Sequence, residues 1–226
     1  MIYEPDVTLT DYGLAVMCAI FARLLLRQEV ERSILRTWFA VFFTAVSAAS
    51  LLGGTVHGFF PDITSAGHRA LWPATLFAIG LAAAAAWMIG LILRFPRDTI
   101  AAVAPALVVG LFAYIAVVLF VSQDFVVAIL GYMPAAAFLL IILTLVYLEV
   151  RQREVLLGVV GVLLTFVAAA VQQLGVGIHP SYFNHDALYH VIQAVALYML
   201  FLSAIWLVAQ KPGGGLGTAQ GGPGYE

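Results

Sequence analysis

The sequence predicts an all-α integral membrane protein in which seven transmembrane helices form one bundle. Of its 226 residues, 63% are apolar and 10% are charged, and the mean hydropathy is +1.04. A soluble domain typically has about 25% charged residues, so a chain of this composition needs lipid as its solvent. These values exclude a soluble globular domain, a disordered chain and a coiled coil. The long continuous apolar runs also exclude the alternating pattern of a membrane β-barrel.

Seven apolar segments with short polar connections define the expected helices. Each segment has close to the 20 or so residues that cross about 30 Å of hydrocarbon. We expect them at about residues 10–27, 34–57, 69–94, 99–122, 125–149, 155–178 and 187–209. Residues 1–209 are thus expected to form a single transmembrane domain. The Gly-rich segment 210–226 has no apolar face to bury and is expected to be a disordered cytoplasmic tail.

The basic residues predict how this bundle lies in the membrane. All but one of them flank the first, third and fifth connections or follow the last span: Arg23, Arg27, Arg32, Arg36, Arg94, Arg97, Arg151, Arg153 and Lys211. At the opposite end there is only Arg69. Because cytoplasmic loops are enriched in Lys and Arg, we expect the N-terminus outside and the C-terminus inside. The expected location is the inner (cytoplasmic) membrane of a bacterium.

Polar side chains gather toward the outer ends of these helices, where all five histidines are expected. Polar groups are costly in lipid and usually face the interior of a bundle. On the second span Ser50 and His57 share a helical face, and on the seventh Asp186, His190 and Gln193 do so. We therefore expect a polar cavity that opens to the outside. Its expected members are Ser50, His57, Gln172, Asp186, His190 and Gln193.

At several of these positions a purely structural role would also explain the polar residue. Asp11 and Asp186 lie near expected helix N-termini, where a carboxylate can cap free N–H groups. Gln172 lies inside an apolar span and needs a partner there, so an interhelical hydrogen bond would account for it. His185 points away from the face of Asp186 and His190, which favours plain exposure.

The polar cavity has the residue types of a catalytic zinc site. Zinc takes His and carboxylate ligands and keeps one position for water in catalytic centres. Asp186 and His190 are four residues apart and can face one ion, and His57 can add a third ligand from another helix. Zinc would activate water and polarise a carbonyl group. We expect His68 to transfer protons or add a ligand, and we expect Ser50, on the face of His57, to be the other catalytic residue.

The segment HDALYH (residues 185–190) and the apolar run after it resemble the last helix of the alkaline-ceramidase-like superfamily, which consists of seven-helix membrane hydrolases. The resemblance implies that zinc is held by His57, which matches the histidine of the second helix, and by His190. It also implies an amide substrate. Asp186 stands where the family has its first motif histidine, Gly53 stands where it has a serine, and the aspartate of its third helix has no clear match.

Other classes of function remain open. His57 and His190 can serve as the axial ligands of a haem, and a transporter is a further alternative, although no repeated halves are evident. A further alternative is a non-enzymatic scaffold or an accessory subunit with a membrane-protein partner. Proteins of this class carry no sequence motif by which they could be recognised. Retinal is excluded because the only lysine, Lys211, lies outside the spans, and a net charge of −2 gives no basic surface for nucleic acid. The leading expectation is a zinc-dependent hydrolase of lipid amides or esters, with membrane lipid as its partner.

The predicted orientation can be tested by cysteine labelling. In a variant with Cys18 replaced and Gln220→Cys added, an impermeant maleimide applied to intact cells should leave the new cysteine unlabelled, because residue 220 is expected in the cytoplasm. Labelling should appear after the membrane is permeabilised. Ready labelling of intact cells would reverse the orientation and place the histidine-rich end in the cytoplasm.

Overall fold

The computed structural model describes residues 2–28, 33–179 and 182–210 and confirms the all-α prediction. Within these residues there are seven helices, each long and apolar enough to cross a membrane. They are α1 (Pro5–Leu26), α2 (Ile34–Phe59), α3 (Ala66–Arg94), α4 (Arg97–Phe120), α5 (Phe125–Val150), α6 (Arg153–Gln173) and α7 (His185–Ala209). The expected tail after residue 210, with Lys211, and also Arg32 lie outside the described residues.

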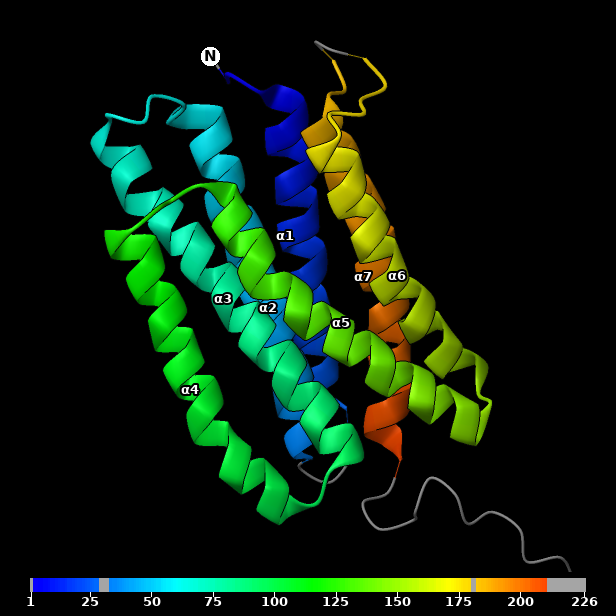
Figure 1. Ribbon diagram of the computed structural model, residues 1–226. Helices are drawn as coiled ribbons and strands as arrows, with labels where there is room; N and C mark the ends of the chain where they lie inside the picture. The colour runs from blue at the N-terminus through cyan, green and yellow to red at the C-terminus, as the bar shows by residue number, and fades with distance from the viewer. Residues whose placement is uncertain (1, 29–32, 180–181, 211–226) are drawn as a thin grey trace, which may run out of the picture.

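The helices run antiparallel in succession, and α4 lies at the edge of the bundle (Figure 1). It packs mainly against α3, and Val118 is its one buried residue among those described. The helix α5 crosses from the neighbourhood of α3 to that of α6, and α1 lies between α2 and α7. Six helices therefore enclose the interior, and most of α4 faces the surroundings.

Two helix ends differ from the expected boundaries for local reasons. The helix α1 begins at Pro5 rather than near residue 10, because the fixed φ of proline suits the first helical position and Thr8 N–H already donates to Glu4 O. The helix α6 ends at Gln173 rather than near residue 178. Gly175 has a φ of +67°, and backbone N–H groups of residues 175 and 176 bond back to Gln172 O and Val171 O. This is the glycine-terminated Schellman end.

The start of α7 decides the role of Asp186. Asn184 is the N-cap, and its side-chain oxygen accepts hydrogen bonds of 3.0 Å from the N–H groups of Asp186 and Ala187. Asn184 N–H in turn donates to Asp6 Oδ2 at 3.1 Å, which ties the first turns of α1 and α7 together. Neither Asp11 nor Asp186 is the cap of its helix, so both carboxylates are available for other contacts.

Aromatic packing fills the half of the bundle away from the N-terminus. The rings of Phe21 (α1) and Phe201 (α7) stack with centroids 4.1 Å apart, and Phe43 (α2) meets both of them edge-on. The helices α6 and α7 approach closely at Gly161, where an added Cβ would lie 2.6 Å from Ala196 O. Close approach at small residues is how helices associate in lipid, where no hydrophobic effect drives them together.

This contact generates a stability prediction. Gly161→Ala should lower the free energy of unfolding by about 1–3 kcal/mol, because the new methyl group meets rigid backbone of α7. The matched control is Gly110→Ala on α4, where an added Cβ has nothing within 4 Å and alanine is the better helix former. The measurement is the thermal unfolding midpoint of detergent-purified protein. Equal midpoints for Gly161→Ala and wild type would contradict the close α6–α7 contact.

Candidate functional site

A cavity of about 250 Å³ lies in the half of the bundle nearest the N-terminus. Residues of α1, α2, α3, α5, α6 and α7 line it. All six side chains expected in a shared polar cavity are among the lining residues: Ser50, His57, Gln172, Asp186, His190 and Gln193. The expectation that these polar side chains of α2, α6 and α7 face one shared cavity, which came from their positions on the helical repeat, is therefore confirmed. Asp11, which we did not include, joins them.

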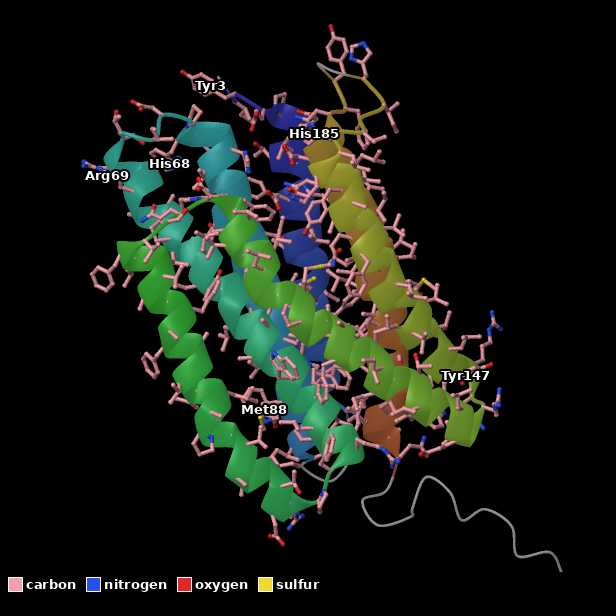
Figure 2. The ribbon with its side chains drawn as sticks, in the orientation of Figure 1. Tyr3, His68, Arg69, Met88, Tyr147 and His185 are labelled. Atoms are coloured by element: carbon pink, nitrogen blue, oxygen red, sulfur yellow. The ribbon has the colours of Figure 1, made fainter. Side chains whose placement is uncertain are left out.

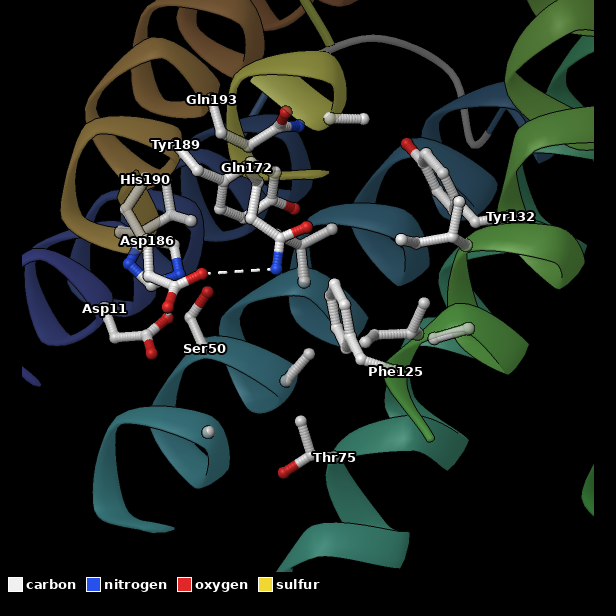
Figure 3. Close-up of a pocket in the computed structure, with 18 of the residues that line it drawn as sticks. Asp11, Ser50, Thr75, Phe125, Tyr132, Gln172, Asp186, Tyr189, His190 and Gln193 are labelled. Atoms are coloured by element: carbon white, nitrogen blue, oxygen red, sulfur yellow. Dashed lines mark hydrogen bonds and ion pairs between the residues drawn. The ribbon is translucent and has the colours of Figure 1, made fainter. Parts of the chain in front are cut away.

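The cavity has a polar side and an apolar side (Figure 3). The side chains of Asp11, Ser50, Gln172, Asp186 and His190 lie together on one side, and Phe125 and Tyr132 lie across from them. The α3 and α5 walls are completed by small and aliphatic residues: Ile79, Ala82, Ala128, Ile129 and Met133. A molecule with a polar head and an apolar chain would match both sides.

The buried pair Asp11 and His190 forms the centre of the polar side. Their side chains join α1 to α7, with His190 Nε2 3.2 Å from Asp11 Oδ1, and the two residues are 8% and 4% exposed. The other ring nitrogen, Nδ1, lies 3.1 Å from the Thr10 hydroxyl. That hydroxyl donates its single hydrogen to backbone carbonyls of its own helix, Asp6 O at 2.8 Å and Val7 O at 3.0 Å.

These contacts define one hydrogen-bond arrangement for the pair. With the Thr10 hydrogen donated within α1, the Thr10 oxygen can accept from an N–H at Nδ1 of His190. The contact between Nε2 and Asp11 then needs a second hydrogen. It comes either from a protonated Asp11 or from an imidazolium. In both cases the two side chains share one proton, and the pair is neutral as a whole.

Ser50 and two glycines of α2 complete the surroundings of Asp11. Ser50 is buried, and its side chain is a hydrogen-bond partner of the Asp11 carboxyl group. A Cβ on Gly54 would lie 2.8 Å from Asp11 Cβ, and one on Gly53 would lie 3.5 Å from Asp11 Oδ2. The Gly53–Gly54 pair thus lets α2 approach α1 and brings the Ser50 hydroxyl to the carboxyl group.

Gln172 has the interhelical role that its position in an apolar span predicted. Its Nε2 donates to Asp186 Oδ1 at 3.2 Å and so links α6 to α7. Two turns deeper, Gln193 Nε2 donates to Thr165 Oγ1 at 3.3 Å and makes a second link between these helices. The second oxygen of Asp186 lies 3.4 Å from Nε2 of the half-exposed His185.

Two predicted histidines lie at the mouth of the bundle. His57 Nδ1 is 2.7 Å from Glu4 Oε2, and His57 borders both the cavity and a second, outer hollow. His68 lines only the outer hollow, and its Nδ1 is 2.9 Å from Phe60 O. Figure 2 shows His68 with Tyr3 and Arg69 at this end of the molecule. The two residues expected to be catalytic therefore lie in different spaces: Ser50 lines the cavity, and His68 lines only the outer hollow.

The expected zinc ligands have other partners. His57 faces Glu4, Asp186 faces Gln172 and His185, and both ring nitrogens of His190 are in contact with α1. Within residues 2–28, 33–179 and 182–210, no group of three or more His, Cys, Asp or Glu side chains has an arrangement that would hold a metal ion. His57, Asp186 and His190 line one cavity, and each of them also has another partner. Zinc binding stays a prediction.

The residue that sequence reasoning underrated is Asp11. It stands at the outer end of a stripe of small residues on α1 that also includes Ala15, Cys18 and Ala22, all buried in the structure. An acid that heads such a stripe is expected to face a neighbouring helix, and this signal was available. The start of α1 at Pro5 places Asp11 in the second turn, which removes the capping alternative.

Metal analysis tests the zinc prediction directly. If zinc binds through His57, Asp186 and His190, purified protein should contain one zinc per chain, and His190→Ala should lose it, because two ligands rarely hold zinc tightly. Leu197→Ala, one to two turns deeper on α7, should keep its metal. The measurement is inductively coupled plasma mass spectrometry after dialysis. Absence of zinc from folded protein purified with added zinc, or full zinc content in His190→Ala, would contradict the prediction.

Comparison with curated proteins and with solved structures found no match. One family matches residues 7–208, a range that contains every residue lining the cavity. By this match, the chain belongs to a family of unknown function, DUF6962.

Proposed function

We propose that the protein is a membrane-embedded hydrolase that cleaves the amide or ester head of an amphiphilic lipid. The observation that supports this most is the buried contact between Asp11 and His190 on the polar side of an amphiphilic cavity. General acid–base catalysis needs a group that holds a proton in position and can take one back. A buried carboxyl–imidazole pair can do both: it becomes an anion when it gives up its shared proton and is neutral again when it takes one back.

Ser50 is the nucleophile in this proposal. Its hydroxyl contacts the Asp11 carboxyl group, which can receive its proton as the oxygen attacks the substrate carbonyl. The Asp11–His190 pair delivers its shared proton to the departing amine or alcohol, and the proton from Ser50 replaces it. Water then cleaves the acyl–serine ester: one water proton returns to Ser50 through the pair, and the fatty acid is released.

The apolar side of the cavity supports a lipid as the substrate. Residues of α3 and α5, among them Ile79, Ile129 and Met133, lie opposite the acid–base pair and suit an acyl chain. The cavity is surrounded by helices that are apolar enough to span a membrane. Such a substrate can therefore reach the site from the bilayer.

The proposed orientation puts the cavity in the outer half of the membrane. In the described part of the chain, the basic residues other than Arg69 lie at helix ends or connections opposite the cavity: Arg23, Arg27, Arg36, Arg94, Arg97, Arg151 and Arg153. With that end in the cytoplasm, the substrate would enter from the outer leaflet. The proposed location remains the inner membrane of a bacterium.

Turnover of fluorogenic long-chain substrates tests the proposal. Wild-type protein in lipid nanodiscs should release umbelliferone from a lauroyl ester or aminocoumarin from the matching amide. Ser50→Ala and Asp11→Asn should each lower kcat by at least about 100-fold, because they remove the nucleophile and one member of the acid–base pair.

Each of these substitutions has a control in which the same residue type is changed outside the cavity. Ser203→Ala removes a buried hydroxyl of α7 that lacks a partner within the described residues and lies outside the cavity lining, so turnover should stay at the wild-type level. Asp98→Asn removes an exposed carboxylate of α4. Wild-type activity in Ser50→Ala would refute its role as the nucleophile. No release from either substrate by folded wild-type protein would count against hydrolysis.

A further inference from the structure

We propose that the cavity binds an amphiphile whose polar head is a primary ammonium group, held between Asp186 and Gln193. This goes beyond hydrolysis because it concerns the chemical class of the bound molecule. It rests on the proposed function only in that both use the same cavity. Two independent observations carry it, one about charge and one about hydrogen bonding.

The charge of the cavity is negative. Its lining has two carboxyl groups, those of Asp11 and Asp186, and no Lys or Arg among the described residues. Asp11 forms a neutral pair with His190, and His57 faces the carboxylate of Glu4. Asp186 has a neutral amide donor at Oδ1, and at Oδ2 it has His185, which balances its charge only when protonated. A cation beside Asp186 would compensate this charge, and a carboxylate or phosphate head would be repelled.

A buried hydrogen-bond acceptor without a donor in the described part of the chain lies two turns deeper on α7 than Asp186. Gln193 is 6% exposed, lines the cavity, and its Oε1 has no hydrogen-bond partner among the described residues. The Thr165 hydroxyl donates to Gly161 O, so the Thr165 oxygen accepts from Gln193 Nε2 and fixes which amide atom is the free acceptor. Leaving a buried acceptor unpaired is costly. A ligand that supplies an N–H there removes this cost.

A primary ammonium is the head group that meets both requirements, a positive charge near Asp186 and a hydrogen-bond donor for Gln193 Oε1. It brings one positive charge for Asp186 and three donors, one of which can bond to Gln193 Oε1. An alcohol has a donor but no charge, and a quaternary ammonium has the charge but no donor. The rings of Trp72, Phe125 and Tyr132 also border the cavity and provide faces that attract a cation. The α3 and α5 side then receives the alkyl chain.

Four compounds with the same dodecyl chain separate these contributions. Dodecylamine, dodecyltrimethylammonium, dodecanol and dodecanoate are each titrated into purified protein in nanodiscs, and the apparent Kd is taken from the shift of the thermal unfolding midpoint. We expect saturable stabilisation by dodecylamine, with an apparent Kd at least tenfold below that of the other three. An apparent Kd for dodecanol equal to that for dodecylamine would overturn the role of charge. Tighter binding of the trimethylammonium compound would overturn the hydrogen bond to Gln193.

Variants place the ammonium in the cavity. Asp186→Asn and Gln193→Leu should each raise the apparent Kd of dodecylamine at least tenfold. The matched control Asp98→Asn should leave it unchanged, because it removes an exposed carboxylate far from α7. The ligand-free unfolding midpoint and gel-filtration profile show whether each variant folds. If Asp186→Asn folds and binds dodecylamine like wild type, the proposal is wrong.

The same set of proteins separates this proposal from hydrolysis. Ser50→Ala lacks the proposed nucleophile and should bind dodecylamine with wild-type affinity. Loss of turnover with retained amine binding in that variant supports both proposals. Turnover by wild type without selective amine binding would refute the ligand class and leave the hydrolase in place. Selective amine binding without turnover of any acyl substrate would do the reverse.

Discussion

The buried contact between Asp11 and His190 is the interaction on which the rest of the site depends. In a chain this apolar, an ionisable group inside the bundle must find a partner, because lipid offers none. The first and last helices of the bundle supply the two members, and Thr10 and Ser50 surround them. The links from Asn184 to Asp6 and from Thr10 to His190 hold α1 and α7 together at this end. The same contacts that close the bundle therefore create its acid–base pair.

Space for the cavity comes from uneven packing along the helices. Large aromatic side chains such as Phe21, Phe43 and Phe201 fill the half of the bundle away from the N-terminus. In the other half, glycines bring the backbones close at some contacts, as Gly54 does against α1, and α1, α2 and α7 carry polar side chains such as Asp11, Ser50 and His190. The interior thus changes from a solid core to a hollow, and most of the buried polar residues among those described line the hollow.

The outer hollow and the cavity adjoin at three residues, which suggests separate routes for water and lipid. His57, Trp72 and Phe125 border both spaces, and the ring of Trp72 is 6.3 Å from that of His57 and 6.2 Å from that of Phe125. In the proposed hydrolase, this cluster stands where water would enter from the aqueous side, and the amphiphile would come from the bilayer. A hydrolase needs both, and an ammonium head fits the Asp186 side of the same space.

The sequence by itself determined that the protein is an all-α membrane protein with seven helices, and it determined six polar residues of the cavity but not Asp11. Hydropathy fixes which segments must lie in lipid, and the helical repeat fixes which side chains share a face, so Ser50, His57 and Gln172 were placed correctly. Tertiary structure decided which atoms meet. Asp11 and His190 are brought together by the packing of the first helix on the last, and His57 turns to Glu4 rather than to Asp186. Helical phase defines a direction for each side chain, but the partner at the end of that direction depends on the rotation and tilt of the neighbouring helix.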